Sequence, residues 1–247
     1  MDFAAGGYRF VPSVFQYSAG VAALPGYRIV RETFAKPVPV ARGFEMIEAR
    51  FKSGGLPTTR FCACELRSPG QFTDAGFKAF NDLYVVTLKK WGIMNDDILN
   101  PVARSNVCPD VGAPDEPSFY AFSYVVEDGG ASAPTAVISG GAEAREGDGP
   151  YAERIIRLGE TSSEAIHEKA LYVVNEMQRR LGLLGFKWTD TTAVQAYSVY
   201  DFHHAMRDMA ELDVLNKGLT WHYARPPVIG LDYEMDCRIV HDEGSWP

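Results

Sequence analysis

The apolar and polar positions along the chain predict alternating strands and helices. Apolar residues recur at helical spacing over residues 73–91 and again over residues 161–181. Shorter segments are apolar and end at glycine, or alternate apolar with polar residues, as strands do. Such strands are predicted over residues 15–22, 58–66, 119–126, 136–141, 192–200 and 231–240. The pattern therefore predicts a protein that contains both strands and helices.

Local signals mark where the helices begin. Thr73 or Asp74 is suited to cap the first helix, and Thr161 with Glu164 forms a capping box for the second. Asp201 is suited to cap a third helix that follows the strand over residues 192–200. Side chains of these types accept hydrogen bonds from the backbone N–H groups that the first helical turn leaves free.

The predicted elements run in a similar order in two parts of the chain. Ser18 and Ser139 are 121 residues apart, and so are Arg104 and Arg225 (139 − 18 and 225 − 104). The small, polar and glycine-rich segment 128–134 is the best linker candidate. We interpret the shared register as a diverged tandem duplication with halves at 1–126 and 127–247. A chance coincidence of two short motifs is the alternative.

Composition narrows the classes of function. The 247 residues are 46% hydrophobic and 23% charged, which is typical of a globular protein with a substantial core. A net charge of -8 argues against nucleic acid and against anionic membrane surfaces as partners. No run of about 18 apolar residues is present, so no membrane span is expected. The N-terminus lacks the pattern of a signal peptide, and the expected location is cytoplasmic.

Cysteine, histidine and glycine spacings offer no cofactor site. The four cysteines do not suggest a disulfide framework in a chain of this length. No closely spaced cysteine or histidine ligands occur, so a metal site is not expected. The glycines form no phosphate-binding fingerprint, which removes support for a nucleotide cofactor. The sequence thus predicts a protein without metal or cofactor.

The segment 219–231 holds the first candidate for chemistry, Arg225. It lies between the aromatic residues Trp221 and Tyr223 and two prolines. Proline restricts the backbone of the residue before it, so Arg225 is held extended. Its planar guanidinium is suited to bind a carboxylate through two N–H groups. His222 is a further candidate for substrate contact. The alternatives are an exposed arginine at the start of a strand and a histidine in a loop.

The last predicted strand holds the second candidate, Glu234. Apolar residues at odd positions from 231 to 239 alternate with polar residues at even positions, so one face is core and the other polar. Glu234 or Asp236 could serve as an acid–base group. The alternative is a solvated sheet face.

The order of motifs in the second half resembles the Rid family, the YjgF-type reactive intermediate deaminases. The motifs are Val137–Gly140, Lys169–Leu171 with Leu181–Gly182, Val194–Tyr197 with Met206, Ala224–Arg225 and Glu234–Cys237. They resemble the family's Val-Ser-Gly strand, its long helix, its next strand and helix, its Ala-Arg signature and the Glu-x-Glu-Ala of its final strand. The first half of the chain resembles the same family more weakly.

The resemblance implies chorismate-mutase-like α+β domains, each a mixed sheet backed by helices. It also implies a trimer of chains, pseudo-hexameric in its domains, with sites at the interfaces. In the family, the arginine that matches Arg225 holds the substrate carboxylate, and the glutamate that matches Glu234 positions water. Pro227 and a short loop before Glu234 depart from the family pattern, so Asp236 stays an alternative. The first half keeps Arg104 but offers no acid.

The predicted function is a metal-independent deaminase. It would hydrolyse an enamine or imine of a small unsaturated amino carboxylate to the oxo acid and ammonia. Aromatic residues at Tyr17, Trp221 and Tyr223 favour a larger 2-aminomuconate-type substrate over 2-aminoacrylate. Arg104 and Ser139 complete the predicted binding residues. The competing hypothesis is a non-catalytic protein that binds a small carboxylate, motivated by Pro227 and by the acid missing from the first half.

Overall fold

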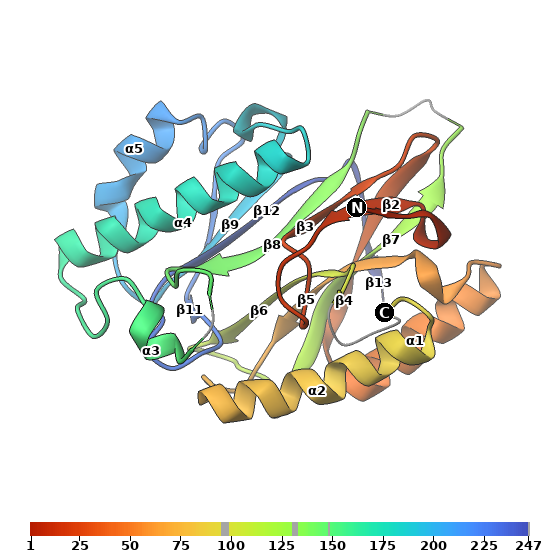
Figure 1. Cartoon of the computed structure of the whole chain (residues 1–247), viewed down its shortest axis with the longest axis horizontal. Coiled ribbons are helices and arrows are strands. Elements are labelled where there is room, and N and C mark those ends of the chain that lie inside the picture. Colours follow the sequence, from red (N-terminus) through yellow and green to blue (C-terminus); the bar gives the residue numbers. More distant parts are fainter. Residues whose placement is uncertain (95–98, 130–132, 148, 247) are drawn as a thin grey trace.

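Two mixed β-sheets pack against each other and carry helices on their outer faces (Figure 1). The computed structural model describes residues 1–94, 99–129, 133–147 and 149–246. Part of the predicted linker, residues 130–132, lies outside these ranges. None of the helices within them is long and apolar enough to cross a bilayer.

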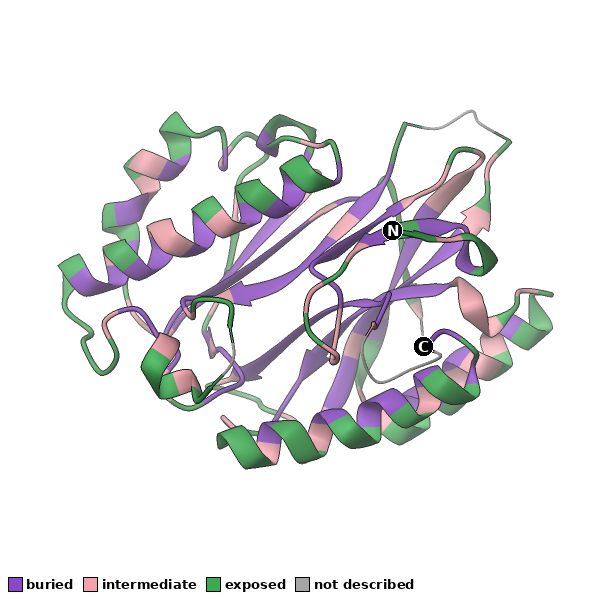
Figure 2. Ribbon diagram, viewed as in Figure 1, coloured by how far each residue is buried: buried purple, intermediate pink, exposed green. Residues whose placement is uncertain are grey.

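The sheets contain seven and six strands. The seven-stranded sheet has the order β1 (Asp2–Phe3), β2 (Tyr8–Val11), β3 (Gly20–Ala23), β8 (Ala136–Ala142), β12 (Glu234–Ile239), β9 (Ala193–Tyr197) and β10 (Thr220–His222). The six-stranded sheet has the order β11 (Ala224–Arg225), β6 (Ala103–Pro109), β5 (Phe61–Arg67), β7 (Ser118–Glu127), β4 (Tyr27–Pro39) and β13 (Asp242–Trp246). Figure 2 shows that the strands are largely buried and that the outer faces of the helices are exposed.

Two pairs of helices cover the sheets. Helices α1 (Val40–Ser53) and α2 (Asp74–Lys90) pack on the six-stranded sheet, and α4 (Ser163–Leu183) and α5 (Met206–Glu211) pack on the seven-stranded sheet. A single turn, α3 (Tyr151–Arg154), precedes α4. Short 3-10 turns lie at Ala4–Gly6, Thr58–Arg60, Trp188–Asp190 and His203–Ala205. The result is four layers, helix–sheet–sheet–helix, which agrees with the predicted α+β class.

The same arrangement of four strands and two helices occurs in both sheets. The strand order is β4-β7-β5-β6 in one and β8-β12-β9-β10 in the other. In each, the first two pairs are antiparallel and the last pair is parallel. The tandem duplication stays a prediction, and this repeated arrangement supports it. The predicted register departs from it at both pairs. Ser18 precedes β3 whereas Ser139 lies in β8, the counterpart of β4. Arg104 lies in β6, whose counterpart is β10, whereas Arg225 lies in β11 of the same sheet as Arg104.

The sheets do not follow the predicted boundary at residue 126. Strands β1, β2 and β3 come from the N-terminus but extend the sheet formed by the second half. Conversely, β13 at the C-terminus pairs in parallel with β4, and β11 pairs with β6. Each sheet is therefore completed by strands from the other half of the chain.

Several helix boundaries match the sequence patterns, and others differ. Thr73 caps α2, because its hydroxyl accepts the N–H of Gly76 at 3.1 Å, as predicted. The cap of α4 is Ser162, whose hydroxyl accepts the N–H of Ala165 at 3.2 Å, so the capping box at Thr161 is wrong. Helix α1 was not predicted, although its buried residues recur at helical spacing. The third predicted helix is a 3-10 turn followed by the short α5.

Charged side chains fill part of the space between the sheets. Arg31 Nε donates to Glu65 at 2.6 Å, and Asp236 accepts hydrogen bonds from Gln195 at 2.8 Å and Tyr197 at 2.9 Å. Burial disfavours the charge on Glu65, but the Arg31 guanidinium outweighs it and lowers the pKa of Glu65 to about 2. The polar face of the last strand is thus buried between the sheets, and the solvated alternative is wrong.

Candidate functional site

A cavity of about 700 Å³ lies where both sheets contribute residues. Arg104 of β6 lines it from the six-stranded sheet, and Glu234 of β12 lines it from the seven-stranded sheet. Its other walls are residues 12–17, the end of β8 with the segment that follows, α3, one face of α4, and Pro227, Val228 and Leu231. Cavities that bind small molecules typically measure about 300–1,000 Å³, so this one is large enough for such a ligand.

Arg104 is buried at the cavity wall, and no acidic side chain among the described residues forms an ion pair with it. It is 2% exposed, and neither Nη1 nor Nη2 has a hydrogen-bond partner in the described part of the chain. Its Cζ lies 4.7 Å from the ring centroid of Tyr84 and 5.2 Å from that of Tyr17. Ring faces attract a cation but cannot accept its N–H groups as a carboxylate does. Because an unpaired buried charge is costly, this guanidinium is suited to an anionic ligand.

Glu234 is buried on the same cavity, where burial favours its neutral form. It is 4% exposed and lines the cavity. Burial, followed by the nearby charge of Asp236, raises the pKa of Glu234 well above its ordinary value of 4.5. A neutral carboxylic acid at this place can donate a proton and later take one back.

Gly140 of β8 leaves the room that the Glu234 side chain occupies. A Cβ added at Gly140 would overlap Oε1 of Glu234. The glycine is part of the predicted strand that ends in Ser-Gly, and its role here is close approach to a carboxyl group rather than a turn.

Comparison with known proteins identifies the family. The family described as "2-aminomuconate deaminase CnbZ" matches residues 1–244. The chain belongs to the CnbZ family. A 2-amino-5-chloromuconate deaminase from Comamonas testosteroni is 48% identical over 238 residues, which covers 96% of this chain and 94% of the relative. The family is thus of the 2-aminomuconate deaminase type that the sequence predicted, and the relation to the Rid family stays a prediction.

A solved structure supports the fold. The crystal structure of a chorismatase matches with a TM-score of 0.50 and 12% sequence identity, covering 90% of this chain and 77% of the chorismatase chain. At this identity the likeness concerns the fold alone, which is a mixed α+β fold with two sheets.

Tyr17 and Tyr151 line the cavity together with its charged side chains. Burial raises the pKa of Tyr17, although Arg180 and Arg104 oppose the shift, so its phenol stays neutral and able to donate a hydrogen bond. Tyr151 contacts Phe77 edge-on, with ring centroids 6.5 Å apart. These rings give the cavity an aromatic wall, and the role of Tyr17 in binding substrate stays a prediction.

Ser139 and Arg180 support the cavity in this CnbZ-family chain. The hydroxyl of Ser139 accepts the N–H of Arg104 at 3.0 Å and donates to the carbonyl of Ser18 at 2.5 Å. It therefore joins the two sheets beside Arg104 instead of lining the cavity. Arg180 reaches from α4, donates to the carbonyls of Ser139 and Gly140 at 3.3 Å each, and bonds Glu176 at 2.7 Å.

The other predicted binding residues of the CnbZ-family chain lie apart from the cavity. Arg225 is on β11 at the edge of the six-stranded sheet, where its Nε lies 3.3 Å from Asp110. Trp221 donates its ring N–H to the carbonyl of Ser198 at 2.9 Å, and Tyr223 is exposed. The structure thus brings together Arg104, Tyr17 and Glu234 and separates Arg225, Trp221 and Tyr223 from them.

His222 and Asp236 belong to the network between the sheets. His222 stacks on Tyr197 and lies 3.0 Å from Oε1 of Gln195. Burial, with Arg67 nearby, lowers the pKa of His222 to about 4, so the ring is neutral at pH 7. Neither residue lines the cavity, and Asp236 is engaged by Gln195 and Tyr197. Of the two carboxylates in question, Glu234 is the one that faces the cavity.

Sequence reasoning missed several cavity residues. Arg180 lies on the buried face of α4, within the row of apolar residues that anchors this helix. A charged residue in such a row was the available signal, because burying it requires partners. Arg145, Tyr151 and Arg154 follow β8 in a segment without periodicity, so no pattern singled them out. Among the described residues, no group of three His, Cys, Asp or Glu side chains is placed to hold a metal ion.

Proposed function

We propose that this chain hydrolyses a 2-aminomuconate-type enamine to the 2-oxo acid and ammonia in the cavity between the sheets. The observation that carries the proposal is that two buried groups line one cavity: Arg104, whose Nη atoms have no partner among the described residues, and the Glu234 carboxyl group. The 2-amino-5-chloromuconate deaminase relative supports the substrate class. The substrate carries a carboxylate next to the carbon that bears nitrogen, and both groups of the site are suited to this arrangement.

Arg104 would orient the substrate. Its Nη1 and Nη2 are both unpartnered, so they can bind the two oxygens of one carboxylate. The rings of Tyr17 and Tyr84 lie close to the guanidinium, at 5.2 and 4.7 Å from its Cζ. Orientation of this kind converts a random encounter into a fixed approach between substrate and acid.

Glu234 would carry the proton through the reaction. As the neutral acid it protonates the enamine carbon, giving an iminium ion and the Glu234 carboxylate. The carboxylate then takes a proton from water while the water oxygen bonds to the iminium carbon. Glu234 returns that proton to the amino group, the C–N bond breaks, and the hydroxyl proton goes back to Glu234. The products are the oxo acid and ammonia. We include metal independence in the proposal, since a protonated imine is already electrophilic.

Ammonia release distinguishes this function from a binding role. The wild-type chain should release ammonia from 2-aminomuconate generated in situ. Glu234→Gln should lower kcat by about 100- to 10,000-fold, the usual contribution of acid–base catalysis, while its melting temperature stays near that of the wild type. A wild-type chain whose melting temperature rises with the substrate, yet which releases no ammonia, would instead support the non-catalytic alternative.

We also propose, from the family resemblance, that the chains assemble as trimers. A solution mass near three times the 27.3 kDa of one chain supports this assembly. A mass of 27.3 kDa at working concentration would contradict it.

A further inference from the structure

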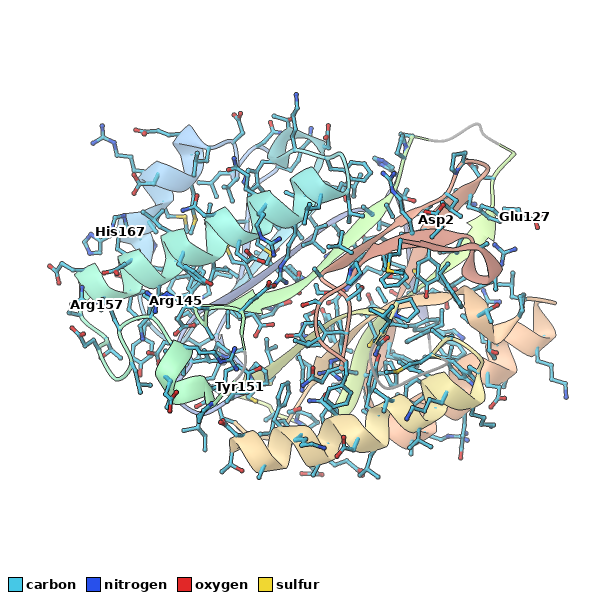
Figure 3. All side chains as sticks on the ribbon, viewed as in Figure 1. Asp2, Glu127, Arg145, Tyr151, Arg157 and His167 are labelled. Atoms are coloured by element: carbon cyan, nitrogen blue, oxygen red, sulfur yellow. The ribbon has the colours of Figure 1, made fainter. Side chains whose placement is uncertain are left out.

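Arg154 presents a second guanidinium on the same cavity. It ends α3, lines the cavity, and its Nε is buried without a hydrogen-bond partner. Its Cζ lies 4.6 Å from the ring centroid of Tyr151, and Nη1 donates to the carbonyl of Arg145 at 2.8 Å. No carboxylate within the described ranges forms an ion pair with Arg154 or Arg145. Figure 3 labels Tyr151, the first residue of α3, and Arg145, which precedes this helix in the chain.

Arg104 and Arg154 flank an aromatic pair on the cavity wall. The Cζ of Arg104 lies 5.8 Å from the ring centroid of Phe77, and Phe77 contacts Tyr151 edge-on. Arg154 contacts Tyr151 in turn. The two guanidinium groups thus contact different rings of this pair, so they are placed to bind separate anionic groups with aromatic surface between them.

The charges of the cavity favour a dianion. Of the acidic residues that line it, Glu146 and Glu176 pair with arginines of α4, and burial disfavours the charged form of Glu234 by raising its pKa. The positive charges of Arg104, Arg145 and Arg154 are left without matching carboxylates in the described chain. A ligand with a carboxylate at each end would balance them.

We propose that Arg154, assisted by Arg145, binds the distal carboxylate of an unsaturated dicarboxylate, while Arg104 binds the carboxylate beside the reacting carbon. The conjugated chain between the carboxylates would lie against Tyr151 and Phe77. This rests on the proposed function for the identity of the reacting end. It makes Arg154 a specificity residue, because a three-carbon enamine has no second carboxylate to reach it.

The test uses two unreactive ligands that differ in one group. Muconate and sorbate are both six-carbon dienes, but muconate has two carboxylates and sorbate has one. The dissociation constants of both are measured by calorimetry for the wild type, Arg154→Gln and Arg157→Gln. Glutamine keeps a donor for the carbonyl of Arg145. Arg157 is the matched control, since it lies further out (Figure 3) and binds Glu160 and Glu168.

The wild type should bind muconate more tightly than sorbate. Arg154→Gln should weaken muconate binding by about 10- to 100-fold, as expected for a lost charge-assisted hydrogen bond, and leave sorbate binding within about twofold. Arg157→Gln should change neither. Equal binding of the two ligands by the wild type, or an equal loss of both in Arg154→Gln, overturns the proposal. The binding measurement uses unreactive ligands and does not depend on deamination. A failure of the proposed function would instead appear as missing ammonia release in the activity assay.

Discussion

Gly140 and Glu234 depend on each other at the scale of single residues. A methyl group at position 140 would overlap the Glu234 carboxyl group, so Gly140→Ala should displace the acid from its place in the cavity. We expect kcat/KM to fall by about 10- to 100-fold, because small displacements of a reacting group are costly. Gly182 on α4 is the matched control, since a Cβ there meets no atom within 4 Å. Full activity in Gly140→Ala would show that the observed position of Glu234 is not needed.

The raised pKa of Glu234 also predicts how stability depends on pH. The folded chain holds a proton that the unfolded chain releases near pH 4.5, so this contribution to stability is present below that pH and is lost as the pH rises towards the folded pKa. Glu234→Gln does not titrate. The free energy of unfolding, measured by urea denaturation, should therefore increase for this variant relative to the wild type as the pH rises from about 5 to 8. A constant difference over this range would contradict the burial of a neutral acid.

At the scale of elements, the two long helices were predictable because their signals are local. Apolar spacing and a capping residue lie within one segment for α2 and α4. Helix α1 was overlooked because Pro37 and Pro39 suggested a break, whereas Pro39 is in fact the residue immediately before the helix. Proline is tolerated there, since the first helical N–H groups have no partner within the helix.

The cap of α4 offers a test at this scale. Ser162→Ala should lower the free energy of unfolding by about 1 kcal/mol, because the N–H of Ala165 loses its acceptor. Thr161→Ala should change it far less, since Thr161 lies outside the cap. Thermal or urea unfolding of both variants gives the comparison, and a larger loss in Thr161→Ala would restore the capping box that the sequence suggested.

The candidate site was only partly predictable, for a physical reason. Glu234 and Arg104 were named from the sequence, but a strand pattern does not tell which strands meet across two sheets. Arg104 reaches the cavity because β6 lies next to β8, and Arg225 lies at a sheet edge because β11 pairs with β6. Such placements depend on contacts between distant segments, which local periodicity does not encode.

For the whole molecule, the exchange of strands between halves predicts that neither half folds alone. Residues 127–247 without β3 would leave the edge of β8 unpaired, and residues 1–126 would lack β11 and β13. Each half expressed separately should show no cooperative melting, and the two halves expressed together should assemble. A cooperative melt of either half alone would contradict this account of the fold.

The most direct measurement compares two arginines. We expect Arg104→Ala to lower kcat/KM for 2-aminomuconate by about 30- to 1000-fold, because it removes the bidentate contact to the substrate carboxylate. Arg104→Lys should recover little of this loss, since an ammonium group lacks the planar fork. Arg225→Ala, at the edge of the same sheet, should stay within a few-fold of the wild type. If Arg225→Ala loses activity while Arg104→Ala retains it, the reaction takes place outside the cavity and the account is wrong.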